Sequence, residues 1–180
     1  MRDRTEYTKR HNKTLMVMMV EIMKKFHMVD EKTVWYRVWT KPEEVKENER
    51  AKVWWNYEWK TPHQCEHRRP DMVVLEKTER RILIIDMACP LEKNVEAKEG
   101  EKTQKYQQLE QEISKMYPEH RAEVVPLVVG CLGGTNNLRR SVQKILGCDE
   151  KEARRTAIEM QRATMIGTGQ VWRNFTNQSD

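Results

Sequence analysis

Residues 68–90 read RRPDMVVLEKTERRILIIDMACP. Two apolar runs rich in Val, Ile and Leu flank a short polar segment, which predicts β-strands at 72–77 and 81–88 joined by a turn. Asp86 lies inside the second run, although aspartate is a poor strand former and is costly to bury without a partner. The hairpin therefore predicts the centre of a sheet, and its buried acid predicts a role beyond folding.

The turn sets which residues of the two strands face each other. A symmetric turn centred between Thr78 and Glu79 places Asp71 directly opposite Asp86. Opposite residues point to the same face, with Cβ atoms about 5 Å apart. Two carboxylates at this separation repel unless a cation lies between them, and oxygen ligands favour Mg²⁺ or Mn²⁺. The alternative is that Asp71 has a capping role and Asp86 pairs with an arginine, and the hairpin alone favours neither.

The remaining segments predict an α/β fold. Apolar spacing and Gly-rich breaks indicate, in chain order, a helix at 14–28 with Thr14 as its N-cap, a loop at 30–50, a strand at 52–60, a helix at 94–116 weakened at Gly100, a strand at 123–131, a loop at 133–137, and helices at 137–146 and 151–173. With the hairpin, the order is α-β-β-β-α-β-α-α. A strand, a helix and a further strand imply a right-handed crossover, so the sheet is mixed.

The length of 180 residues favours one domain with a sizeable core. We expect 1–50 to form an N-terminal helix and connecting loop, 51–133 the core that carries the sheet, and 134–180 helices that pack on or extend that core. The chain has 33 Lys and Arg against 28 Asp and Glu, a net charge of +5 and a pI near 9.0. This basic balance favours a polyanionic partner.

Cysteine usage and hydropathy bear on the location of the protein. The four cysteines contain no C-x-x-C pair and stand far apart, which indicates reduced thiols of an intracellular protein. The longest apolar run, 15–20, is too short to cross a bilayer and lacks a small-residue cleavage site. We therefore expect no membrane partner, and an intracellular rather than a secreted protein.

The helix expected at 94–116 carries lysines close to its apolar stripe. That stripe consists of Val95, Tyr106, Leu109, Ile113 and Met116. Lys102 falls near its middle, whereas Lys98 and Lys105 fall at its edge. An inward lysine beside paired acids suits phosphodiester hydrolysis, in which a metal activates water and the ammonium steadies the developing charge. The alternative, equally compatible with the spacing, is a solvated run of charges at the start of a helix.

The order Pro70-Asp71, a second acid on the next strand and then a lysine resembles the PD-(D/E)XK restriction-endonuclease-like superfamily. Most members carry the lysine two residues after the second acid, where this chain has Ala88. One branch carries it on the following helix: the restriction-enzyme-like endonuclease at the C-terminus of certain site-specific non-LTR retrotransposon proteins. The chain resembles this branch in the segments YTKRHN (7–12), KVWWNYEWKT (52–61), EHRRPDMVV (66–74), LIIDMACP (83–90), KEGEKTQKYQQL (98–109), VVPLVVGCLG (124–133) and QRATMIGTGQVWR (161–173).

This resemblance implies a fold and an activity. The fold would be a restriction-endonuclease-like mixed β-sheet, with an α-β-β-β-α-β core flanked by helices. The activity would be that of an Mg²⁺-dependent (or Mn²⁺-dependent) endodeoxyribonuclease that nicks target DNA, so that the new 3′ end primes reverse transcription. The partners would be DNA and the upstream reverse transcriptase domain or element RNA. The location would be nuclear, and no small-molecule cofactor is implied.

The resemblance also assigns roles to individual residues. By the motif, Asp71 and Asp86 would hold the metal, and Lys102 would be the displaced catalytic lysine, with Lys105 as its rival and Tyr106 in support. The helical wheel favours Lys102 over Lys105. The expected contacts to the DNA backbone are those of Arg68, Arg69 and Lys98.

Two alternatives remain open at the level of sequence. Acids frequent in the family are replaced here by Asn56 and Pro62, so the chain could instead be a catalytically inactive nucleic-acid-binding remnant of the same fold, or a structural fragment of a longer protein. In HQCEH, the side chains of His63, Cys65 and His67 alternate and could bind zinc. Alternate residues of one strand seldom give closed tetrahedral geometry, which favours phosphate contact or simple packing there.

Overall fold

The computed structural model describes residues 3–38 and 42–176, with the side chains of 3–5 left aside. These residues divide into two compact units. Unit 1 comprises 3–38, 87–98 and 128–176, and unit 2 comprises 42–86 and 99–127. The expectation of one domain, with parts at 1–50, 51–133 and 134–180, stays a prediction.

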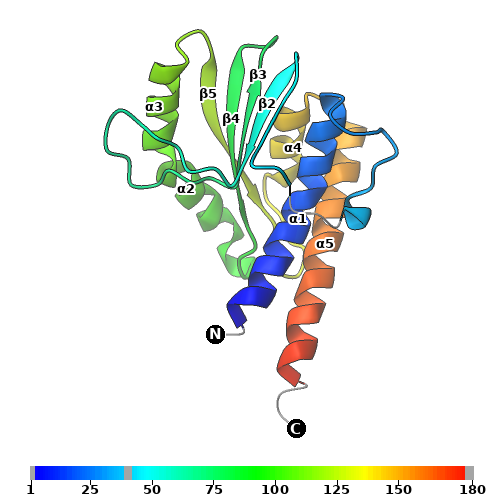
Figure 1. Cartoon of the computed structure of the whole chain (residues 1–180). Coiled ribbons are helices and arrows are strands. Elements are labelled where there is room, and N and C mark those ends of the chain that lie inside the picture. Colours follow the sequence, from blue (N-terminus) through cyan, green and yellow to red (C-terminus); the bar gives the residue numbers. More distant parts are fainter. Residues whose placement is uncertain (1–2, 39–41, 177–180) are drawn as a thin grey trace. The chain divides into compact units, whose positions relative to one another are not determined.

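A five-stranded sheet forms most of unit 2 (Figure 1). Its strands, in spatial as well as chain order, are β1 (Val45–Glu47), β2 (Ala51–Trp55), β3 (Met72–Glu76), β4 (Arg81–Ala88) and β5 (Arg121–Val128). The first four pair antiparallel. Next to β4, the amides of Arg121 and Val129 donate to the carbonyls of Arg80 and Ala88. Both pairs are separated by the same number of residues, so β5 runs parallel to β4 and the sheet is mixed.

The β3–β4 hairpin has the register that the sequence predicts. The ladder runs from Met72 opposite Ile85 to Glu76 opposite Arg81, so the turn is centred between Thr78 and Glu79. Glu76 is 1% exposed and accepts two hydrogen bonds from the Arg81 guanidinium, at 2.6 and 3.0 Å. This bidentate cross-strand pair stabilises the end of the ladder next to the turn.

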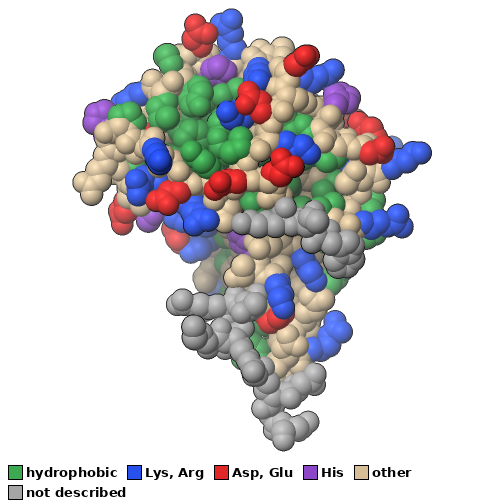
Figure 2. All heavy atoms as spheres, in the orientation of Figure 1, with side chains coloured by type: hydrophobic (Ala, Val, Ile, Leu, Met, Phe, Trp, Pro, Cys, Tyr) green, Lys and Arg blue, Asp and Glu red, His purple; other side chains and the backbone are tan. Residues whose placement is uncertain are grey.

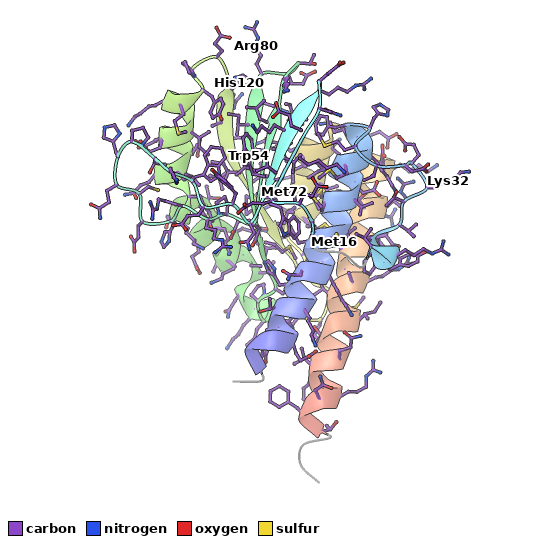
Figure 3. The ribbon with its side chains drawn as sticks, in the orientation of Figure 1. Met16, Lys32, Trp54, Met72, Arg80 and His120 are labelled. Atoms are coloured by element: carbon purple, nitrogen blue, oxygen red, sulfur yellow. The ribbon has the colours of Figure 1, made fainter. Side chains whose placement is uncertain are left out.

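The core of unit 2 lies between one face of the sheet and helix α3 (Gln107–Met116). Alternate residues of the hairpin, such as Val73 and Ile84, pack with Leu109 and Ile113 of the helix. Trp54 packs against Trp59 in the same cluster, with ring centroids 4.9 Å apart. Figure 2 shows hydrophobic side chains gathered over this part of unit 2, where Figure 3 labels Trp54.

The long helix expected at 94–116 is divided, and the division does not fall where the sequence suggests. Helix η2 (Glu92–Asn94) and helix α2 (Val95–Lys105) come first, and α3 starts after Tyr106. Gly100 lies inside α2, where its exposed position tolerates the modest helix penalty of glycine. Tyr106 is 1% exposed, and its φ of −103° and ψ of 8° interrupt the helix, so the break lies at this buried tyrosine rather than at the glycine.

Unit 1 is built on the helices α1 (Asp3–Lys25), α4 (Leu138–Leu146) and α5 (Glu150–Thr176), with the short helix η1 (Trp35–Arg37). Helices α1 and α5 run side by side (Figure 1). Thr14 and Thr164 share a buried hydrogen bond of 2.8 Å between them. The prediction that Thr14 caps the first helix is wrong, because α1 begins eleven residues earlier in the chain, at Asp3. Thr14 instead donates to the carbonyl of Arg10 within the helix.

The strand expected at 52–60 is shorter in the structure, where β2 ends at Trp55, and the helix expected to reach residue 28 ends at Lys25. The other predicted elements agree with the structure, with one addition. The strands at 72–77, 81–88 and 123–131 and the helices at 137–146 and 151–173 are present with small shifts of their ends. The segment expected at 30–50 as a loop that could include a helical turn contains the short helix η1 and also strand β1, which the sequence did not predict. Its residues 39–41 lie outside the described residues. None of the described helices combines the length and apolar composition that crossing a bilayer requires.

Candidate metal and phosphodiester site

Two acids meet at the end of the β3–β4 ladder that lies away from the turn. Asp71 directly precedes β3, and Met72, labelled in Figure 3, opens the ladder opposite Ile85. The next position outward places Asp71 opposite Asp86, as the hairpin predicts. Asp86 is 3% exposed, whereas Asp71 is half-buried. The pair therefore has one acid inside the protein and one toward its surface.

A second segment positions the backbone of Asp71. The amide of Asn56, just after β2, donates to the Asp71 carbonyl at 2.8 Å. Asn56 has a φ of 49°, a left-handed conformation that asparagine tolerates better than most residues. Arg69 Nε in turn donates to the Asn56 carbonyl at 3.0 Å. Sequence reasoning treated Asn56 only as a departure from the family pattern and missed this role.

The side chains of Lys102 and Tyr106 converge on Asp86. They stand four residues apart, at the end of α2 and at the break after it, and so point to the same side. Lys102 Nζ forms an ion pair with Asp86 Oδ2, and its side chain is 13% exposed. Tyr106 Oη donates to Asp86 Oδ1 at 2.9 Å and lies 3.2 Å from the carbonyl of Arg69. Both carboxylate oxygens of Asp86 thus have a donor.

The electrostatics of the cluster differ from those of an ordinary surface ion pair. Burial raises the pKa of Asp86 above its usual value, and the charge of Asp71 raises it further, while Lys102 and Tyr106 act in the opposite direction. The pKa of Tyr106 is also raised, by its burial and by the carboxylate of Asp86. The phenol therefore stays protonated and remains a hydrogen-bond donor at neutral pH.

The donor set of the site fits a hard divalent cation. Mg²⁺ is commonly bound by one or two carboxylates, with water and substrate phosphate completing its coordination, and Asp71 and Asp86 supply two carboxylates. A cation between them would relieve the repulsion that raises the pKa of Asp86. In the part of the chain that the structure describes, no group of three or more His, Cys, Asp or Glu side chains forms a larger ligand set.

The remaining predicted residues have other surroundings in the structure. Lys105 Nζ lies 4.7 Å from the centroid of the Tyr106 ring. The exposed Arg68 pairs with Glu58 at 3.0 Å, and Arg69 is held by Asn56. Lys98 is half-buried on α2, one helical turn before Lys102. Of the two candidate lysines, the structure therefore brings Lys102 to the acid pair.

The three side chains of HQCEH have different neighbours, and the ring centroid of His67 lies 6.4 Å from that of Tyr106. His63 Nδ1 lies 3.0 Å from Glu112 Oε2, and its backbone amide donates to the same carboxylate at 3.2 Å. Cys65 is buried and its thiol donates to the carbonyl of His67 at 3.4 Å. The His63–Glu112 pair joins residues 49 apart, and no local pattern in the sequence could have indicated it.

Comparison with known protein families gives no match, and comparison with curated proteins likewise gives no match. The assignment of a function to this chain therefore depends on the residues of the site and on their geometry.

Proposed function

We propose that this chain is a metal-dependent endodeoxyribonuclease domain of the restriction-enzyme-like type, derived from a non-LTR retrotransposon protein. The observation that carries the proposal is the placement of Asp71 opposite Asp86, with Lys102 from the following helix on the same carboxylate. Two strand acids and a helix lysine at one point are the parts that phosphodiester hydrolysis requires. The resemblance of the sequence supplies the family, and the mixed sheet is compatible with it.

Each residue of the cluster has a role in this proposal. Asp71 and Asp86 would hold Mg²⁺ or Mn²⁺, which polarises a phosphate and lowers the pKa of bound water. Tyr106 donates to Asp86 and so orients its carboxylate. Lys102 holds an ammonium beside the acids, where it steadies negative charge as it develops on the phosphate. The exposed Arg68 would contact the DNA backbone.

The biological setting follows from the proposed family. The substrate is DNA, nicked so that its 3′ end primes reverse transcription, and the partner is the upstream reverse transcriptase domain or the element RNA. The place of action is the nucleus. The net charge of +5 is in keeping with a polyanionic substrate.

The test is nicking of supercoiled plasmid in Mg²⁺ or Mn²⁺ by four proteins: the wild type, Asp71→Ala, Lys102→Ala and Lys105→Ala. We expect the wild type to convert supercoiled to open-circular DNA, and Asp71→Ala and Lys102→Ala to reduce the initial rate at least ~100-fold. Lys105→Ala is the matched control on the same helix, with an expected change of no more than about threefold, because Lys105 contacts the Tyr106 ring rather than the acids.

Circular dichroism of each variant ensures that a loss of nicking is not a loss of folding. Equal losses in Lys102→Ala and Lys105→Ala would remove the assignment of Lys102. Absence of metal-dependent nicking by folded wild type would overturn the nuclease proposal for this chain.

One observation favours a second candidate, a nucleic-acid-binding remnant that no longer cleaves. Lys102 and Tyr106 already occupy both carboxylate oxygens of Asp86, so the buried acid is compensated without a metal. Such a protein would bind duplex DNA with strong salt dependence and leave plasmid intact at every metal concentration.

A further inference from the structure

Unit 1 contains a buried cation, Arg10, that has no carboxylate partner among the residues that the structure describes. Arg10 of α1 is 7% exposed. Its Nη1 donates to Thr168 Oγ1 at 3.1 Å and its Nη2 donates to the carbonyl of Cys89 at 3.0 Å. Its Nε is buried and has no hydrogen-bond partner. Its Cζ lies 5.2 Å from the centroid of the Tyr7 ring. Among the described residues no Asp or Glu forms an ion pair with Arg10, although a guanidinium is always charged and costly to bury.

Arg10 lines a cavity of about 700 Å³ whose other walls are mostly apolar. Helix α5 contributes Trp172 and Phe175, which are 66% and 45% exposed, and Leu91 is 60% exposed at the rim. Large apolar side chains that are this exposed, gathered around one buried charge, are typical of a binding surface rather than of ordinary solvent-facing helix.

Glycine at position 167 makes this arrangement possible. A Cβ on Gly167 of α5 would lie 2.6 Å from Cγ and 2.8 Å from Cβ of Arg10, closer than real side chains approach. The absence of a side chain therefore lets the Arg10 stem pass against α5 and carry the guanidinium to Thr168. Helices α1 and α5 therefore leave room for the Arg10 side chain at Gly167.

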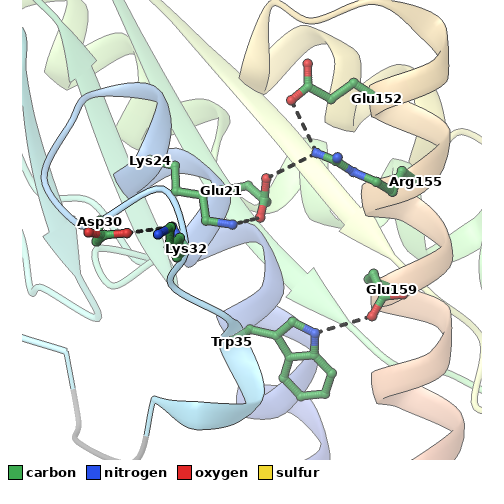
Figure 4. Close-up of polar contacts among 8 residues, drawn as sticks. All are labelled: Glu21, Lys24, Asp30, Lys32, Trp35, Glu152, Arg155 and Glu159. Carbon is green, nitrogen blue, oxygen red and sulfur yellow. Dashed lines mark hydrogen bonds and ion pairs between the residues drawn. The ribbon is translucent and has the colours of Figure 1, made fainter.

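A second cavity of unit 1, of about 730 Å³, shows the contrast. There Glu21 accepts from Lys24 at 2.9 Å and lies 3.9 Å from Arg155, which also pairs with Glu152 at 3.5 Å (Figure 4). The acids and bases that line it neutralise one another. The cavity at Arg10 differs because the charged residue of its lining is a cation with no acidic partner in the described part of unit 1.

The helices around Arg10 are themselves poor in acids. From Tyr7 to Val20, α1 has no Asp or Glu, and α5 has none from Met160 to its end. The same segments carry Lys13, which donates to Gln170 at 2.7 Å, and the exposed Arg173. The electrostatic complement of this surface is therefore an anion, and the exposed aromatic rings add a preference for flat apolar groups.

We propose that this cavity binds single-stranded nucleic acid, with a phosphate at the Arg10 guanidinium and a base stacked on Trp172. Repeated phosphates and bases combine the two features that the cavity presents, and stacking on an aromatic ring is available to every base. The proposal concerns residues of unit 1 alone and does not rest on the acid pair of unit 2 or on its proposed activity.

The test is fluorescence anisotropy of a labelled oligo(dT) strand with the full chain. Trp172→Ala is expected to weaken binding roughly tenfold, because it removes one stacking platform, while Trp172→Phe keeps most of the affinity. Ile166→Ala is the matched control, since Ile166 is 51% exposed on the same helix but does not line the cavity. Equal affinities of the wild type and Trp172→Ala would overturn the proposal, as would equal losses in Trp172→Ala and Ile166→Ala.

A second variant tests the phosphate contact. Arg10→Gln is expected to lower the slope of log Kd against log salt by about one, the signature of one lost phosphate contact. Arg10 is buried, so Arg10→Gln could unfold the protein. In that case the affinities of the Trp172 variants still test whether the strand binds in this cavity. Anionic lipid vesicles and a DNA duplex of equal length serve as competitors. Displacement of the oligonucleotide by the vesicles but not by the duplex would contradict a nucleic-acid site.

The failure of this proposal is distinguishable from failure of the nuclease proposal. Plasmid nicking measured on the same preparations reports on Asp71 and Asp86, whereas strand binding reports on Arg10 and Trp172. Strand binding that depends on Trp172 without any nicking would support the cavity and count against the nuclease. Nicking without strand binding would support the nuclease and count against the cavity.

Discussion

Asp86 and Glu112 are two buried carboxylates of unit 2 that respond to their surroundings in opposite ways. Asp86 is 3% exposed, and its burial together with Asp71 raises its pKa. Glu112 is 5% exposed, yet hydrogen bonds from Lys115 and His63 lower its pKa to about 2. The two shifts have different dominant causes: burial is the largest influence on Asp86, whereas at Glu112 the hydrogen bonds from Lys115 and His63 outweigh burial.

The difference teaches how a functional cluster can be told from a structural one. The partners of Glu112 reach it from the surface, since the side chains of His63 and Lys115 are 70% and 59% exposed. Asp86 instead shares its site with a second acid, and its cation, Lys102, is itself 13% exposed. Two neighbouring acids with one lysine leave a net negative charge that a divalent cation would compensate, whereas Glu112 has two cationic or hydrogen-bonding partners and no second acid among the causes of its shift.

The largest expected effect on stability comes from removing Lys102, the cation that pairs with Asp86, and the matched change removes Lys115, which pairs with Glu112. Lys102→Met should reduce the free energy of unfolding at neutral pH by about 2 kcal/mol, because it leaves a buried carboxylate beside a second acid. Lys115→Met, the matched change at Glu112, should cost clearly less, because Lys115 is mostly exposed to water. Urea unfolding of the two variants measures both effects, and equal losses would break the comparison.

A smaller effect is expected from adding metal. If Asp71 and Asp86 hold Mg²⁺, the cation should stabilise the folded wild type by about 1.4 kcal/mol at ten times its Kd. Thermal unfolding of the wild type, Asp86→Asn and Glu112→Gln, each with and without Mg²⁺, measures it. The rise in Tm should persist in Glu112→Gln and disappear in Asp86→Asn, and an equal rise in all three would point to binding elsewhere.

The smallest effect is the dependence of stability on pH, which should have opposite signs at the two acids. The raised pKa of Asp86 means that the folded state holds its proton more tightly, so the contribution of this group to stability falls as the pH rises above 3.8. The lowered pKa of Glu112 means that its contribution is present above pH 4.5 and is lost as the pH falls toward 2.

Urea midpoints between pH 3 and pH 7 would separate these contributions. Relative to the wild type, Asp86→Asn should gain stability as the pH rises through this range. Glu112→Gln should instead lose stability relative to the wild type over the same interval, as the wild-type carboxylate becomes ionised. Parallel curves for the two variants would contradict the opposite shifts.

Some elements could be predicted because their signals are local. The hairpin and its turn follow from alternation of side chains and from symmetry about one turn. The register from Met72–Ile85 to Glu76–Arg81 is confirmed, and its next position outward is that of Asp71 and Asp86. The stripe on α2 and α3 favoured Lys102, and this lysine lies at Asp86. By contrast, β1 is a strand of three residues with little apolar pattern, which explains why the loop prediction missed it.

By itself, the sequence determined the α/β class, the order of most elements and the opposition of the two acids, because each depends on residues close together in the chain. Only the tertiary structure decided which partners the buried charges have. Two such contacts join distant segments: His63 pairs with Glu112, and Arg10 lies beside Thr168. The helix break at Tyr106 likewise accompanies the burial of its side chain in the fold. No periodic pattern encodes these contacts, since a polar side chain that is costly to bury alone takes whichever donor or acceptor the packed fold brings within reach.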